Sequence, residues 1–141
     1  MTEARDAVEA AIPEPFALFV RGKPQPQGSK RHVGGGVMIE AVKGVAVWRC
    51  DVRDALNLEW HEEPRDGAVV VILSFQFLRP KSVTEKKRPY MTVKPDVDKL
   101  ARAVLDAMTG VVLSEDARVV HLTAEKRYGF VAGVDISVRW L

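Results

Sequence analysis

Hydrophobic residues alternate with polar residues along much of the chain, which is the pattern of strands that bury one face. A short apolar run predicts a strand at Phe16 to Val20, and the alternation predicts strands at Ala68 to Leu78, Val119 to Tyr128 and Val134 to Trp140. The second of these is apolar at almost every position of its first half. We therefore expect that half to be buried on both faces, in the centre of a sheet. Val111 to Leu113 adds a short strand or an extended connection.

Two other stretches repeat apolar residues every three or four positions, which is the spacing of a helix that buries one side. The first runs from Val45 to about Glu62 and is ended by Pro64. The second begins at Pro95 or Asp96 and stops at Gly110, a residue that suits the end of a helix. Together the elements predict an α/β (α+β) fold, in which a single-layer mixed sheet packs with two main helices.

The composition is that of an ordinary globular protein, with 141 residues, 47% hydrophobic and 28% charged. We expect one domain at residues 16–141, preceded by an acidic leader at residues 1–15 that lacks fixed structure. Cys50 is the only cysteine, which excludes an intramolecular disulfide and fits a reducing compartment. No apolar run approaches the roughly 20 residues that span a bilayer. We therefore expect a cytoplasmic protein with no membrane partner.

Positive charge is concentrated in two loops, although the formal net charge of the whole chain is only +2. Residues 21–36 are rich in glycine and contain no acidic residue, and residues 79–94 contain six basic residues and one acidic residue. Such loops suit a nucleic-acid backbone, although charge runs are also common in loops that are merely solvated. The loop residues that we expect to contact DNA are Lys23, Lys30, Arg31, Lys81, Lys86, Lys87, Arg88 and Lys94.

Two aspartates, Asp96 and Asp98, stand where an extended segment enters the second helix, and Asp116 follows in a turn after that helix. If Asp96 sits at the cap, both carboxylates can turn toward one point, which Asp116 could join. Clustered carboxylates repel one another unless a cation compensates, and Mg²⁺ prefers such oxygen ligands. A metal there would polarise a phosphate and activate water. The same residues also suit structural roles, because aspartate is common at helix N-caps and in turns.

The segment Lys94-Pro95-Asp96-Val97-Asp98-Lys99-Leu100, followed by residues 103–112 and then Glu115-Asp116, resembles the RusA-type crossover junction endodeoxyribonucleases of bacteria, prophages and phages. The loop at residues 22–28 and the strand residues 124–128 are weaker matches to the same family. The resemblance covers most of the chain from about Phe16, and the motif around the two aspartates is its specific part.

The resemblance implies a RusA-like homodimer that binds Holliday (four-way) junctions and nicks them symmetrically with Mg²⁺ or Mn²⁺, in DNA recombination and repair. It places the protein in the cytoplasm of a bacterial cell or a phage-infected host. It also implies that Asp96, Asp98 and Asp116 are the metal-binding catalytic carboxylates. On this reading, Lys126 and Arg127 join the loop residues that hold the DNA backbone.

Two positions depart from the family pattern, because Lys99 replaces the usual asparagine and Arg102 replaces a functionally important lysine. Arginine keeps the positive charge but hardly deprotonates, so we hypothesise that Lys99 takes over part of the lost role. We expect Asp106 to pair with Arg102 across one helical turn. The alternatives are a non-catalytic junction- or DNA-binding module of the same fold, and a nuclease for other branched DNA such as flaps and forks.

Overall fold

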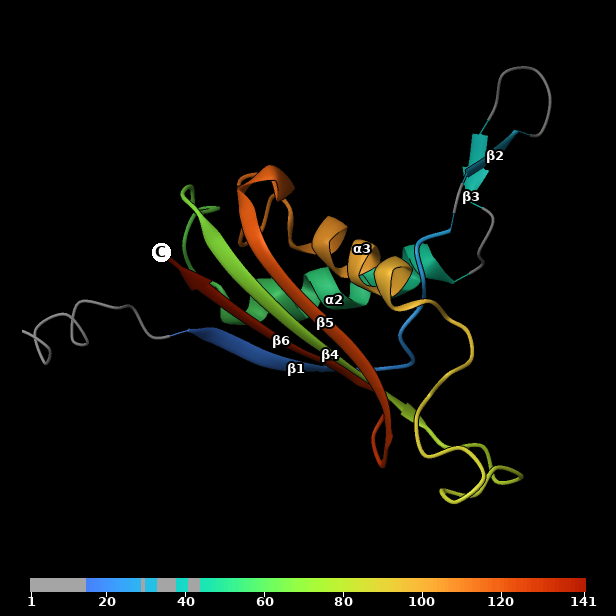
Figure 1. Cartoon of the computed structure of the whole chain (residues 1–141). Helices are drawn as coiled ribbons and strands as arrows, with labels where there is room; N and C mark the ends of the chain where they lie inside the picture. Colours follow the sequence, from blue (N-terminus) through green and yellow to red (C-terminus); the bar gives the residue numbers. More distant parts are fainter. Residues whose placement is uncertain (1–14, 29, 33–37, 41–43) are drawn as a thin grey trace, which may run out of the picture.

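The computed structural model describes residues 15–28, 30–32, 38–40 and 44–141, in which a four-stranded sheet packs against two helices (Figure 1). The strands of this sheet are β1 (Phe16–Arg21), β4 (Val69–Leu78), β5 (Val119–Gly129) and β6 (Gly133–Trp140). The helices are α2 (Val45–Glu59) and α3 (Val97–Met108), and a 3-10 turn, η1 (Asp116–Arg118), precedes β5. A separate antiparallel pair is formed by β2 (Lys30–His32) and β3 (Met38–Glu40). The predicted mixed sheet with two main helices is confirmed.

The centre of the sheet is occupied by β4, as its apolar sequence predicts. The strand order is β1-β6-β4-β5, with β6 antiparallel to both of its neighbours and β4 parallel to β5. A parallel pair needs a crossover connection, which α3 supplies. The crossover brings the N-terminus of α3 to the end where β4 and β5 finish, and it leaves η1 at the end where β5 starts.

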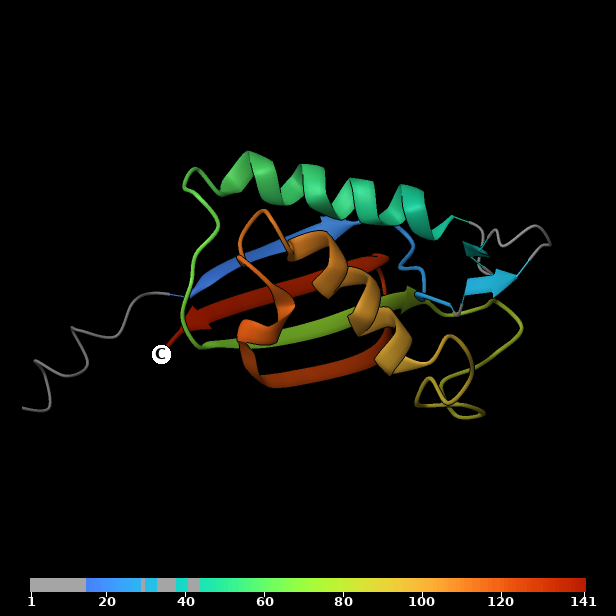
Figure 2. The same ribbon diagram turned by 90° about the horizontal axis from the view of Figure 1, so that it is seen from above.

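Both helices cover the same face of the sheet, with α2 closer to β1 and α3 closer to β5 (Figure 2). Every second residue of β4 faces the helices and is buried: Val69, Val71, Leu73, Phe75 and Phe77. The opposite face, which we call the open face, has no helix over it. It includes Ile72, Ser74 and Gln76 of β4, Glu125 and Arg127 of β5, and Asp135 of β6.

Three local predictions are wrong. The first half of β4 is buried on one face only, because Ile72 lies on the open face with 47% of its surface exposed. The helix that was expected to reach Glu62 ends at Glu59, since Trp60 leaves the helix and stacks on Trp140, with 5.3 Å between ring centroids. Residues 111–113 form a buried turn rather than a strand, because all three of their amides donate to the carbonyl of Met108.

The predicted leader at residues 1–15 falls outside the described residues except for Pro15. None of the helices in the described part of the chain has the length and apolar character that crossing a membrane requires.

Candidate functional site

The N-terminus of α3 presents the two aspartates of the motif without using either as a side-chain cap. Asp96 is the N-cap residue, with extended backbone angles, and its carbonyl accepts the first helical bond from the Leu100 amide at 3.1 Å. Its carboxylate makes no capping hydrogen bond and lies instead 3.6 Å from the Lys99 ammonium. Asp96 therefore does not act as a side-chain N-cap, which is the structural role that aspartate often has at this position.

Lys126 of β5 fixes the segment that leads into Asp96. Its ammonium donates to the carbonyl oxygens of Val93, at 2.6 Å, and Pro95, at 2.8 Å. Lys126 stands opposite Phe75 of β4, so its side chain leaves the sheet on the helix-facing side. The loop before Asp96 is thus held by a charge-assisted contact from the sheet.

The first basic loop packs against the start of α3. The Gln27 amide donates to the Lys99 carbonyl at 2.9 Å, and the Arg49 guanidinium of α2 donates to the Gln27 side chain. At Gly22 the backbone φ is +144°, and a Cβ there would lie 2.9 Å from the Trp48 ring. Glycine is needed for this close approach of the loop to α2.

Between the two loops lies a pocket of about 380 Å³, which we call the lysine pocket. Its lining residues are Lys23, Pro24, Gln25, Pro26, Gly28, Lys94, Pro95, Asp96 and Lys99. Three of them are lysines that come from three different segments, and all three stand in one hollow with the Asp96 carboxylate. Three lysines that line one pocket suit the phosphate of a nucleic acid.

A second pocket, of about 460 Å³, runs between α3 and β5 and holds the other two motif aspartates. It is lined by Val97, Asp98, Ala101, Arg102, Leu105, Asp106, Asp116, Leu122 and Ala124. The carboxylates of Asp98 and Asp116 form no hydrogen bond or ion pair with any other described residue, so both are available to a ligand. The predicted Arg102–Asp106 ion pair is not formed, although both side chains line this pocket.

The structure therefore brings Asp98 and Asp116 into one pocket and places Asp96 in the adjoining one. Within the described ranges, no group of three or more histidine, cysteine, aspartate or glutamate side chains is close enough to hold a metal ion. Mg²⁺ does not need such a cage, because it commonly binds one or two carboxylates together with water and substrate phosphates. The free carboxylate oxygens at Asp98 and Asp116 fit that donor requirement.

The other residues predicted to bind DNA divide into three groups. Lys81, Lys86 and Lys87 are exposed on the 79–94 loop. The side chains of Lys30 and Arg31, in β2, are outside what the structure describes. Arg88 turns inward, and its Nε donates to the Tyr128 hydroxyl at 2.9 Å.

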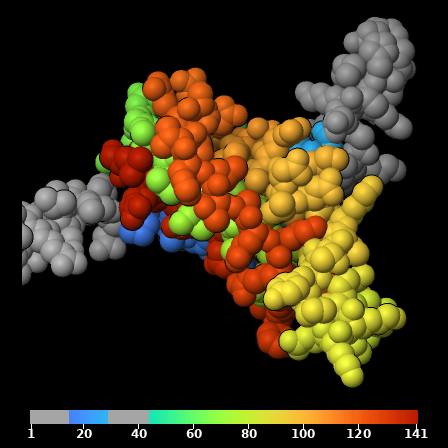
Figure 3. Space-filling model, viewed as in Figure 1, coloured from blue at the N-terminus to red at the C-terminus, as the bar shows by residue number. Residues whose placement is uncertain are grey.

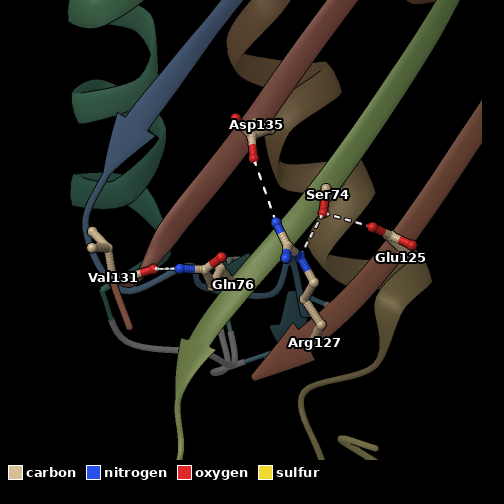
Figure 4. Close-up of polar contacts among 6 residues, drawn as sticks. All are labelled: Ser74, Gln76, Glu125, Arg127, Val131 and Asp135. Carbon is tan, nitrogen blue, oxygen red and sulfur yellow. Dashed lines mark hydrogen bonds and ion pairs between the residues drawn. The ribbon is translucent and has the colours of Figure 1, made fainter. Parts of the chain in front are cut away.

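Arg127 lies on the open face, away from the motif aspartates. Its guanidinium contacts the Ser74 hydroxyl at 3.3 Å and the Asp135 carboxylate at 3.9 Å (Figure 4). Lys126 and Arg127 are adjacent in β5, and the alternation of the strand sends them to opposite faces of the sheet.

Sequence reasoning missed the anchoring contacts of Lys126, for which the strand pattern held a signal. Leu122, Ala124 and Tyr128 alternate on the helix-facing side of β5, and Lys126 falls in the same register. A lysine on a covered face has to find acceptors for its ammonium group. The nearest loop, residues 93–95, provides two backbone carbonyls.

Comparison with known proteins shows the family of the chain. The family model of the RusA endodeoxyribonucleases matches residues 21–139 of the 141-residue chain, a range that contains both pockets and both basic loops. A search of curated proteins finds no match. Enzymes of the RusA family cut DNA internally and resolve Holliday junctions. The chain belongs to the RusA endodeoxyribonuclease family.

Proposed function

We propose that the chain resolves four-way DNA junctions as a magnesium-dependent homodimer, with Asp96, Asp98 and Asp116 as the metal-binding carboxylates. The observation that carries this proposal is the pair Asp98 and Asp116, which line one pocket beside the pocket of three lysines and whose carboxylates have no partner among the described residues. Other branched DNA, such as flaps and forks, would be read by the same site.

The chemistry divides between the two pockets. Lys23, Lys94 and Lys99 bind backbone phosphates and draw the strand along the N-terminus of α3. Arg102 stands in the second pocket, where its guanidinium offsets the negative charge that develops on the phosphate. Asp96, Asp98 and Asp116 would hold Mg²⁺, which would polarise the phosphate and lower the pKa of the attacking water.

Removal of divalent metal should stop cleavage without preventing binding. Labelled four-way junction and linear duplex would each be incubated with the protein in Mg²⁺, in Mn²⁺ and with a chelator. Symmetric nicks on the junction in either metal, and none with the chelator, are expected, because the carboxylates alone cannot activate water for phosphodiester hydrolysis. Cleavage that persists in the chelator would contradict the metal dependence. Tight junction binding with no cut in either metal would favour the non-catalytic module.

Replacing Lys99 with alanine should slow cleavage by about 10-fold. Loss of a fully enclosed donor that stabilises the transition state costs ~100-fold. We expect a smaller effect here because the Lys99 side chain is 43% exposed. Lys99 lies in the lysine pocket, 3.6 Å from the Asp96 carboxylate, so its loss removes both a phosphate contact and a partner that orients Asp96. Single-turnover rates on a junction would measure the effect. Cleavage equal to that of the wild type would show that Lys99 takes no part in the reaction.

The proposal of a homodimer is based on the symmetry of the substrate. A four-way junction presents two equivalent strands to be cut, and a two-fold dimer carries one active site for each strand. Light scattering of the free protein and of its junction complex would test it. A mass of one chain in both states would contradict the dimer.

A further inference from the structure

The tip of the β5–β6 turn carries a large aromatic side chain that the fold does not use. Phe130 is 98% exposed, more than any other large hydrophobic side chain described. Burial of a phenylalanine side chain stabilises a folded protein, and this position gives up that gain. An isolated aromatic ring held in solvent suits contact with a partner.

The turn that presents Phe130 is held from both sides. The Gln76 side-chain amide of β4 donates to the Val131 carbonyl at 2.6 Å (Figure 4), and the Gly22 amide donates to the Ala132 carbonyl at 3.0 Å. These contacts fix the backbone that immediately follows Phe130. The backbone next to the ring is therefore held in place, which lowers the entropic cost of binding.

A pocket of about 630 Å³ lies between this turn and the 79–94 loop. It is lined by Leu78, Arg79, Glu85, Pro89, Tyr128, Gly129 and Phe130. The Arg79 guanidinium lies 4.3 Å from the centroid of the Tyr128 ring and donates to the Arg88 carbonyl, while Arg88 binds the Tyr128 hydroxyl. The Tyr128 wall is thus aromatic and is fixed by cation–π and hydrogen-bond contacts.

The loop that forms the second wall also supplies positive charge. Lys81, Lys86 and Lys87 are exposed on it, and none of them forms an ion pair with a described residue. Loop and turn project side by side from the same end of the molecule (Figure 3). Exposed lysines beside aromatic surface are the combination that binds phosphates and unpaired bases together.

The pocket is connected to the candidate active site by β5. Lys126 anchors the segment before Asp96, and Phe130 follows four positions later. At a strand rise of about 3.3 Å per residue this separation is roughly 13 Å, or about four base-pair steps of a DNA strand. One bound DNA molecule can therefore reach both places.

We propose that Phe130 and this pocket form a stacking site for a nucleobase at the branch point of the DNA. The inference rests on the proposed function, since it assumes that branched DNA is bound. At a branch point a base lacks one of its stacking neighbours, so an aromatic ring can replace that neighbour. In a linear duplex the same contact would require base pairs to be unstacked, which costs free energy. The site thus favours branched over linear DNA.

The test measures binding of DNA in a chelator, where cleavage does not interfere, to a four-way junction and to a linear duplex of the same sequences. Phe130→Ala is expected to weaken junction binding by about 5- to 100-fold, the range found for loss of one base–aromatic stack. It should leave duplex binding unchanged, and Phe130→Trp should restore the junction affinity. Leu58→Ala, at a 74% exposed position of α2, is the matched control and should change neither affinity. A junction with 2-aminopurine at the branch point reports stacking directly by its fluorescence.

Equal junction affinities for Phe130→Ala and the wild type would overturn the inference, as would an equal loss on junction and duplex. An unchanged melting temperature for Phe130→Ala, expected because the ring is exposed, excludes misfolding as the cause of a loss. The proposed function fails separately, if the wild-type protein cuts no junction in Mg²⁺ or Mn²⁺. The binding and fluorescence readouts would still decide the role of Phe130 in that case.

Discussion

Asp98→Asn should reduce junction cleavage by at least about 100-fold, because even outer-shell partners of a metal ligand cost 10- to 100-fold when removed. Asp98 lines the second pocket together with Asp116. It also follows Asp96, which lines the lysine pocket, by two residues in the first turn of α3. Asparagine keeps the size of the side chain and removes its charge. The expected loss is therefore of metal binding and not of fold.

Junction binding should survive the same change, or tighten, because one negative charge facing the phosphates is removed. Single-turnover cleavage and binding in a chelator would be measured on the same preparations, with titration calorimetry of Mg²⁺ as a readout that does not depend on activity. Asp54→Asn is the matched control, since Asp54 is an exposed aspartate of α2 outside both pockets. Wild-type cleavage by Asp98→Asn would remove this carboxylate from the proposed metal site.

The alternation and helical repeats of the sequence predicted the four strands of the main sheet, the two main helices and the central place of β4, but not the β2–β3 pair. They could not show that both helices cover the same face of the sheet. Val70 and Ile72 are apolar although they lie on the open face, so hydrophobicity does not distinguish that face from the covered one. Residues 111–113 form a buried turn instead of the predicted short strand or extended connection for a related reason. Its three apolar side chains, Val111, Val112 and Leu113, are buried by a turn that closes on Met108, and a run of three residues has no period to read.

The motif predicted that Asp96, Asp98 and Asp116 would converge on one point. Asp98 and Asp116 line one pocket, but no group of three such side chains among the described residues is close enough to hold a metal ion. The motif did not predict that Asp96 would face a separate pocket and pair with Lys99, because that choice depends on a side-chain rotation at the N-cap. Lys126 and Arg127 were both predicted to bind the DNA backbone, although neighbouring residues of a strand point to opposite faces of the sheet. Lys126 therefore reaches the loop before Asp96 while Arg127 pairs with Asp135 on the open face.

Lys126→Met should lower the rate of junction cleavage at saturating protein by about 10- to 100-fold, since a misplacement of 1 Å at a reacting centre can cost about 100-fold. Methionine matches the length of the lysine side chain but cannot donate to the Val93 and Pro95 carbonyls. The segment before Asp96 would then lose its two contacts with the sheet. The Asp96 carboxylate, which follows Pro95 directly, would no longer be held in place.

The salt dependence of binding separates this positioning role from the DNA contact that the sequence suggested for Lys126. A lysine that neutralises a phosphate reduces the slope of log Kd against log salt by about one when it is removed, and it weakens binding to every sequence alike. A lysine that only positions the loop leaves that slope unchanged and lowers the saturated rate. We expect the second result, because the Lys126 ammonium is already bound to two carbonyls. Arg139→Met, at an exposed open-face position of β6, controls for the loss of a positive charge from the sheet. A reduced slope with an unchanged saturated rate would return Lys126 to the DNA-binding surface.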